Sequence, residues 1–221
     1  DVWEEFCKQI LKMERANETS EVVEENNAEI LTQSVLELNI TEPFVDLLVT
    51  SPPYVTSYEY ADIHQLSTLW LDYSPDYKHF RTGSIGSLYH SCDLRFNVPK
   101  LNQSGLTVVM QMYSVDKKQA KAIAQYYVNM QEVVKKICNI VKKGGACLFV
   151  IGNTEYKNVK IDNARHLAES LLNEGFYNVT IKRRKILNKI LTPYRDKNGK
   201  FSSDKTSRKI YSEEFLIFAQ L

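Results

Sequence analysis

The feature that most constrains the fold of this 221-residue chain is a short apolar run that ends in two consecutive prolines. The run covers Val45 to Thr50 and reads as a strand, and Ser51-Pro52-Pro53-Tyr54 follows it directly. Each proline fixes its own φ, lacks an N–H and pushes the preceding residue towards extended backbone. The sequence therefore predicts a strand that ends in a rigid corner. At this corner backbone carbonyl oxygens are available as acceptors, and the two prolines offer no N–H donors.

A corner of this kind can hold an amino group on a flat ring. The oxygens of Ser51 and Pro52 can accept both N–H bonds of such a group, which draws the nitrogen lone pair out of conjugation with the ring. Pro53 would fix the corner, and Tyr54 would stack on the ring. Pro-Pro before an aromatic residue also occurs in polyproline segments that dock on a partner. The apolar strand before the corner favours the catalytic interpretation.

The residues around the corner resemble those of a known enzyme family. From Thr50 the chain reads TSPPYVTSYEYADIHQLSTLWLDY, and Ile85-Gly86-Ser87 and Ile151-Gly152-Asn153 follow in that order. This arrangement is similar to that of the amino-group DNA methyltransferases of restriction–modification systems, whose motif is Ser, Asp or Asn, then Pro-Pro, then Tyr, Phe or Trp. The resemblance extends from about Ala28 to the C-terminus.

The resemblance implies an enzyme that transfers a methyl group from S-adenosylmethionine to an exocyclic amino group of a base in DNA. Ser51, Pro52, Pro53 and Tyr54 would be its catalytic residues, and serine in the first place favours cytosine N4 over adenine N6. The implied fold is a Rossmann-like α/β methyltransferase fold, with three layers, a mostly parallel sheet and a C-terminal antiparallel hairpin. Two alternatives remain: an RNA amino-methyltransferase, and a non-catalytic nucleic-acid-binding subunit that has lost its cofactor site.

The chain departs from the family pattern at the cofactor. The family holds S-adenosylmethionine on a Phe-x-Gly-x-Gly loop, and this sequence contains no such loop. The cofactor-binding residues are therefore unknown. We interpret the chain as the C-terminal part of a methyltransferase domain that is incomplete at its N-terminus and can be inactive alone. The missing strands would lie on an upstream segment or on a second subunit.

Five further residues are candidates for binding the nucleic acid. Tyr58 and Tyr60 could form a wall on which an extruded base stacks, although packing in the fold is an equal alternative. Asn153 follows a predicted parallel strand and would face the ligand crevice, unless it only forms the turn. Arg183 and Arg184 belong to a basic C-terminal region that could contact DNA phosphates, or could be a solvated hairpin without a partner.

Periodicity and turn residues predict most of the secondary structure. The first half would contain an N-terminal helix through Trp3 and Met13, a strand at Ala28 to Gln33, a packed helical stripe from Ile63 to Tyr73, and a loop from Arg81 to Leu106. The second half would contain a long helix from Lys117 capped by Gly144-Gly145, a strand at Ala146 to Ile151, a helix between Asp162 and Gly175, and antiparallel strands at Asn178 to Ile186 and Glu213 to Leu221.

One domain accounts for the whole chain, because 43% hydrophobic and 25% charged residues suit a single core. Residues 1–221 would form the catalytic part, with a lid or target-binding insertion at 55–115 and a basic loop at 187–212. No apolar stretch is long enough to cross a bilayer and no signal peptide is visible, so the cytoplasm is the expected location. The four histidines lack ligand spacing, so no metal is expected.

Overall fold

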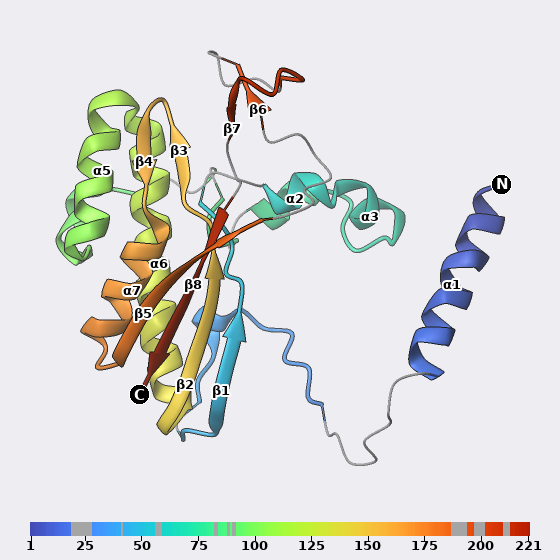
Figure 1. Cartoon of the computed structure of the whole chain (residues 1–221), viewed down its shortest axis with the longest axis horizontal. Coiled ribbons are helices and arrows are strands. Elements are labelled where there is room, and N and C mark those ends of the chain that lie inside the picture. Colours follow the sequence, from blue (N-terminus) through green and yellow to red (C-terminus); the bar gives the residue numbers. More distant parts are fainter. Residues whose placement is uncertain are drawn as a thin grey trace. The chain divides into compact units, whose positions relative to one another are not determined.

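The computed structural model describes residues 1–18, 28–40, 42–55, 59–81, 84–87, 89, 92–186, 194–196, 202–209 and 213–221 (Figure 1). The chain divides into two units, Asp1–Gln33 and Ser34–Leu221. Most of the predicted basic loop at 187–212, and Tyr58, lie outside the described residues. Among the described helices, none combines the length and the apolar composition that a membrane crossing requires.

The first unit contains the predicted N-terminal helix, α1 (Val2–Glu18). Its apolar side chains are exposed, and the rings of Trp3 and Phe6 stack with their centroids 5.4 Å apart. The strand predicted at Ala28 to Gln33 is wrong, because this backbone has no regular structure. A strand needs a partner edge for its N–H and C=O groups, and a short apolar run does not by itself supply one.

The second unit is built on a four-stranded sheet in the order β1-β2-β8-β5 (Figure 1). The strands are β1 (Val45–Thr50), β2 (Val141–Ile151), β5 (Tyr177–Lys185) and β8 (Glu213–Gln220). β1 and β2 are parallel, and β8 is antiparallel to both of its neighbours. β1, β2 and β5 therefore run in one direction and β8 alone is reversed, which confirms the predicted Rossmann-like α/β fold with a closing antiparallel pair.

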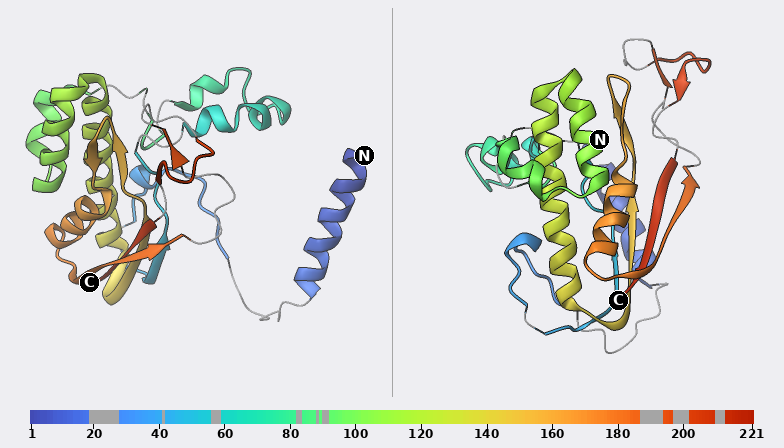
Figure 2. Two further views of the ribbon diagram at one scale, coloured as in Figure 1. Left: turned by 45° about the horizontal axis from the view of Figure 1, so that its top comes forward. Right: turned by 90° about the vertical axis from the view of Figure 1, so that its left-hand side faces the viewer.

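Helices cover one face of this sheet (Figure 2). They are α5 (Gln103–Val115), α6 (Lys117–Ile140) and α7 (Asn163–Asn173), and α6 and α7 pack on the buried side chains of Phe149 and Ile217. On the other face Leu47 and Val49 of β1 are each 60% exposed. Within the described part of the second unit, the sheet and one helical layer are thus seen, and the outer face of the sheet is open.

The segment between the corner and α5 forms short helices: α2 (Tyr60–Ile63), α3 (Gln65–Trp70), η2 (Tyr77–Arg81), α4 (Leu94–Asn97) and η3 (Val98–Lys100). The prediction that the stripe from Ile63 to Tyr73 packs in a core is wrong, because Leu66 is 78% and Trp70 89% exposed. The Arg81 guanidinium holds this segment together instead. It donates to Asp62 Oδ1 at 2.8 and 2.6 Å and lies 4.2 Å from the Tyr89 ring centroid.

The predicted loop to Leu106 ends early, because α5 begins at Gln103. The Asn102 side chain caps this helix by accepting from Gly105 N at 2.8 Å. Glu169 of α7 adds two long-range bonds, from the N–H groups of Gln103 and Ser104, each 2.9 Å long. An Asn cap was a visible signal for this helix, but the support from Glu169 was not.

Gly144 has a different role from the one predicted. α6 ends at Ile140, and Val141 after it is already extended, so Gly144-Gly145 does not cap the helix. Gly144 does have a left-handed φ of +84°, but it lies inside β2, where the pairing with β1 shifts register between Val45 and Leu47. The left-handed conformation of Gly144 therefore accommodates an irregularity in the pairing of β2 with β1.

The remaining predicted elements are confirmed, and several small ones are new. Asp162 caps α7 by accepting from Arg165 N at 3.1 Å, and Gly175 follows the helix with φ +91°. The small elements that the sequence did not predict are η1 (Val35–Glu37), β3 (Thr154–Tyr156), β4 (Val159–Ile161), β6 (Tyr194–Arg195) and β7 (Arg208–Lys209).

Candidate functional site

Ser51 lies at the carboxyl end of β1, the edge at which open α/β sheets bind ligands. Its side chain is exposed, and its hydroxyl donates to the Val150 carbonyl of β2 at 3.0 Å. A serine hydroxyl has one proton and two lone pairs. Because Val150 takes the proton, the Ser51 oxygen is left as an acceptor, and the Tyr54 phenol is one donor near it.

The two proline carbonyls differ in their partners. Pro53 O accepts a 2.8 Å hydrogen bond from the Tyr126 hydroxyl, which comes from α6 and is buried. Within the part of the chain that the structure describes, no donor is bound to Pro52 O. Ser51 is exposed and Pro52 is buried, so the two oxygens differ in how accessible they are, and their role as acceptors for an amine stays a prediction.

The Tyr54 ring lies against Gly152, at the end of β2. A Cβ placed on Gly152 would be 2.9 Å from Tyr54 Cε2, which is closer than real Cβ contacts. Burial raises the pKa of the Tyr54 phenol, opposed by hydrogen bonding with Ser51 and the Gly152 backbone, while the charges of Glu214 and Tyr60 raise it further. The phenol is therefore protonated at neutral pH and lies close to the Ser51 hydroxyl.

A second glycine lies against the Tyr54 backbone. Gly86 has φ +91°, and a Cβ on it would be 3.5 Å from the Tyr54 carbonyl oxygen and 3.6 Å from the Tyr126 ring. Next to it, the Ser87 hydroxyl donates to Glu59 Oε2 at 2.8 Å. The three sequence segments that carry the resemblance, around Ser51, Gly86 and Gly152, therefore meet at one place.

Of the two tyrosines predicted to stack on a base, only Tyr60 is described. It is the first residue of α2 and is 41% exposed. Its charge is a minor cause, after burial, of the raised pKa of both Tyr54 and Tyr126. Tyr60 thus has an accessible side chain, and its role as a stacking residue stays a prediction.

Asn153 is near the corner, but both ends of its amide are engaged elsewhere. Its Nδ2 donates to Asp162 Oδ1 and its Oδ1 accepts from Ala164 N, each at 2.9 Å. These bonds connect the turn after β2 to the start of α7. They match the alternative in which Asn153 forms the turn and does not face the ligand crevice. The neighbouring polar residue, Asn163, was missed by sequence reasoning, and its Nδ2 donates to Gly152 O at 2.9 Å.

Arg183 and Arg184 are adjacent on β5, so their side chains lie on opposite faces of the sheet. Arg183 Nε is 3.4 Å from Glu213 Oε2, and Arg184 Nε is 2.6 Å from Glu214 Oε1. Both predicted phosphate contacts are therefore paired with carboxylates of β8. Sequence reasoning also missed Glu214, whose charge is one of the lesser causes of the raised pKa of Tyr54.

The described residues do not supply the glycine cradle that would hold S-adenosylmethionine. Of the six described glycines, Gly86, Gly105, Gly145 and Gly152 have the chain's own atoms at their Cβ positions. Gly144 and Gly175 are open, but one lies within β2 and the other follows α7. No described residue is therefore assigned to the methyl donor. Among the described residues, no three His, Cys, Asp or Glu side chains gather as metal ligands.

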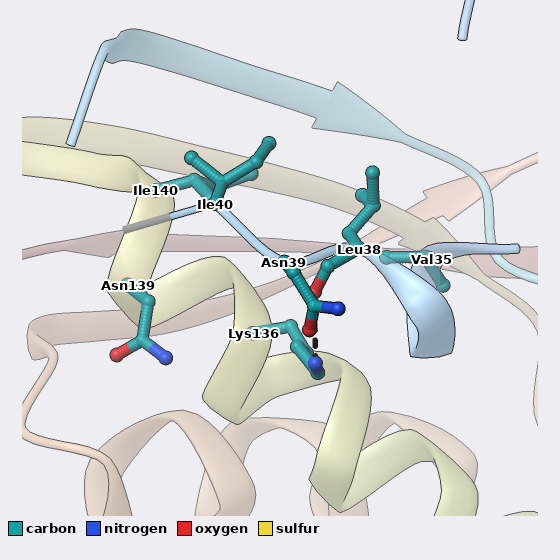
Figure 3. Close-up of a pocket in the computed structure, with 7 residues that line it drawn as sticks. All are labelled: Val35, Leu38, Asn39, Ile40, Lys136, Asn139 and Ile140. Carbon is teal, nitrogen blue, oxygen red and sulfur yellow. Dashed lines mark hydrogen bonds between the residues drawn. The ribbon is translucent and has the colours of Figure 1, made fainter. Parts of the chain in front are cut away.

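Figure 3 shows a hollow that none of the corner residues Ser51 to Tyr54 lines. It has a volume of about 200 Å³ and is formed by residues 35–40 against the end of α6. Lys136 Nζ crosses it to donate to Leu38 O at 2.8 Å. Phe44 N bonds Ile140 O just before β1, so the hollow lies at the amino ends of the parallel strands, opposite to the edge used for ligands.

No family model matches the sequence, and no curated protein matches it. Among solved structures, a "Putative DNA Modification Methylase" from Thermus thermophilus is similar over 82% of this chain and 48% of that chain, at 13% identity and a TM-score of 0.35. The structure of that protein in complex with S-adenosyl-L-methionine is similar over 82% of this chain and 49% of that chain, at 13% identity and a TM-score of 0.34. This chain thus spans about half the length of those chains. A likeness of this size carries no part of the functional argument.

Proposed function

We propose that this chain holds the exocyclic amino group of a DNA base for methylation by S-adenosylmethionine. One observation carries the proposal: the Ser51 hydroxyl gives its proton to Val150 O at 3.0 Å, so the exposed Ser51 oxygen is an acceptor, and beside it the carbonyl of the buried Pro52 has no donor among the described residues. An amino group on a ring offers two donors and fits this pair. A polyproline docking segment would present an extended surface, whereas here the corner is tied to β2 and α6.

The chain's own part in the chemistry is to prepare the nitrogen. With both N–H bonds accepted by Ser51 and Pro52, the nitrogen becomes pyramidal and its lone pair turns away from the ring. S-adenosylmethionine would supply the electrophilic methyl group, and Ser51 and Pro52 would hold the amine that receives it. In-line placement and exclusion of water would provide the acceleration.

We propose DNA as the nucleic acid and cytosine N4 as the favoured target over adenine N6, because serine opens the motif. The extruded base would stack on Tyr54, with the exposed Tyr60 ring beside it. An RNA amino-methyltransferase uses the same corner chemistry and is separated by the substrate that takes up the label.

The test is transfer of a tritiated methyl group from S-adenosylmethionine to duplex genomic DNA and, in parallel, to transfer RNA. We expect label in DNA, with N4-methylcytosine as the product by mass spectrometry. Label confined to transfer RNA would assign the RNA activity, and N6-methyladenine would correct the base. Equal labelling by a Ser51→Ala variant would overturn the proposed role of the corner.

A second candidate is a non-catalytic nucleic-acid-binding subunit, favoured by the lack of a glycine cradle among the described residues. Titration calorimetry of this chain with S-adenosylmethionine decides between the two. Binding with transfer supports the enzyme. DNA binding without any uptake of the methyl donor supports the non-catalytic subunit.

A further inference from the structure

Two buried polar side chains hold the two backbone segments between which Tyr54 lies. The Tyr126 hydroxyl of α6 donates to Pro53 O at 2.8 Å, and Asn163 Nδ2 of α7 donates to Gly152 O at 2.9 Å. Pro53 directly precedes Tyr54, and Gly152 lies under its ring. The bond to Pro53 O therefore fixes the backbone that leads into Tyr54, and the bond to Gly152 O fixes the backbone against which the Tyr54 ring lies.

Both donors are shielded from water. Tyr126 is 2% exposed and Asn163 is fully buried. The bond to Gly152 O is buried and the bond to Pro53 O is partly buried, so a carbonyl that loses its donor finds little water in exchange and the loss costs free energy. The backbone at Pro53 depends on its carbonyl for anchoring, because neither proline of the corner has an N–H.

The packing leaves little room for the corner to move. The Cβ position of Gly152 is 2.9 Å from the Tyr54 ring, and that of Gly86 is 3.6 Å from the Tyr126 ring. A shift of the Pro53 carbonyl rotates the peptide that joins it to Tyr54 and carries the Pro52 carbonyl with it. The orientation of the amine acceptor and that of the stacking ring are thus set together by two side chains that bond to the chain's own backbone.

We infer that Tyr126 and Asn163 are positioning residues for the base-holding corner: they fix the carbonyls of Pro53 and Gly152 and thereby aim the Pro52 oxygen and the Tyr54 ring. The inference rests on the proposed function. Transfer to a nitrogen requires near-linear approach, and a misplacement of about 1 Å costs roughly 100-fold in rate. Loss of one anchor should therefore lower the rate of the chemical step and leave nucleic-acid binding unchanged.

The decisive variant is Tyr126→Phe, which removes only the hydroxyl. Tyr127→Phe is the matched control, because Tyr127 is the next residue of α6, is equally buried, and has a hydroxyl without a hydrogen-bond partner among the described residues. The single-turnover rate and the KM for DNA are measured for both, normalised to the folded fraction. We expect a rate about 10- to 100-fold lower for Tyr126→Phe, with KM for DNA within about twofold, and a parent-like Tyr127→Phe.

A Tyr126→Phe rate equal to the parent rate overturns the inference, as does an equal loss in Tyr127→Phe, which would indicate a packing effect. If Tyr126→Phe does not fold, Asn163→Ala gives the same readout from the other side of Tyr54. Failure of both to fold would make the residues structural and also overturns the inference. No transfer by the parent chain under conditions in which it binds both S-adenosylmethionine and DNA would instead defeat the proposed function itself.

Discussion

The Tyr54 ring lies on Gly152, although the two residues are almost a hundred positions apart and belong to different turns at the same edge of the sheet. A Cβ on Gly152 would be 2.9 Å from Tyr54 Cε2 and 3.4 Å from Cδ2. Only glycine leaves space for the ring in this place. The need for glycine after β2 therefore follows from the corner after β1.

Gly152→Ala should displace the Tyr54 ring and destabilise the fold by about 1–3 kcal/mol, the usual cost of overpacking. We expect methyl transfer to fall with it, because the stacking ring and the corner move together. A double-mutant cycle with Tyr54→Ala checks the cause: without the ring, Gly152→Ala should cost much less. The same loss of stability in both backgrounds, measured by urea unfolding, would contradict the contact.

The sequence predicted the parts of the fold whose signals are local. β1 and its corner, α6, and α7 between Asp162 and Gly175 all followed from short apolar runs, helical spacing, prolines and caps. The strand expected at Ala28 to Gln33 did not form, because a strand also depends on a partner edge. Gly144 was expected to cap a helix. A glycine with a left-handed φ occurs both in helix caps and in strand irregularities, and the sequence alone does not distinguish the two.

The candidate site was predictable only where its residues are contiguous. Ser51 to Tyr54 could be recognised as a unit, and the order of the Gly86 and Gly152 segments indicated that they belong with it. Tyr126 and Asn163 could not be found, because their role depends on contacts made 73 and 11 residues away, respectively. The pairing of Arg184 with Glu214 was hidden for the same reason, since it requires the register of β5 against β8.

Ser51→Ala should abolish methyl transfer and leave DNA affinity unchanged, because it removes one of two acceptors for the amine. The cost in stability should be small, roughly 1 kcal/mol for one exposed hydrogen bond to Val150 O. Ser114→Ala is the control, since Ser114 is also exposed and its hydroxyl also donates to a backbone carbonyl, Gln111 O, at 2.7 Å. Parent-like transfer by Ser51→Ala would remove serine from the mechanism.

The stability of the fold should fall when the pH drops below about 6.5. Burial lowers the pKa of His166 to about 3, and its ring stacks on Tyr127 at 3.9 Å. As the pH falls, the unfolded chain protonates this histidine before the folded chain does. The contribution of the neutral His166 to the free energy of unfolding is therefore complete above the unfolded pKa of about 6.5 and is lost towards pH 3. The slope should reach roughly 1.4 kcal/mol per pH unit, measured by urea unfolding across this range.

The variant His166→Gln separates the pH dependence of stability that comes from His166 from the pH dependence that comes from carboxylates. The pKa of Glu169 is lowered by its hydrogen bonds with Ser104 and Gln103, which outweigh its desolvation, so its contribution is lost only at more acidic pH. We expect His166→Gln to flatten the stability profile between about pH 6.5 and pH 5, although the variant itself is less stable. An unchanged slope in that interval would show that His166 is not the titrating group.

The unpaired lysines of β5 should contribute more to DNA affinity than the two arginines between them. Lys182 and Lys185 are exposed and have no ion-pair partner among the described residues, whereas Arg183 and Arg184 are paired with Glu213 and Glu214. A cation already neutralised by a carboxylate releases few counterions when it meets a phosphate. Lys182→Ala and Lys185→Ala should each lower the slope of log affinity against log salt by about 1, and Arg183→Ala by much less. Equal slopes for all three variants, measured by fluorescence anisotropy on one duplex, would show that the carboxylates do not compete with the phosphates.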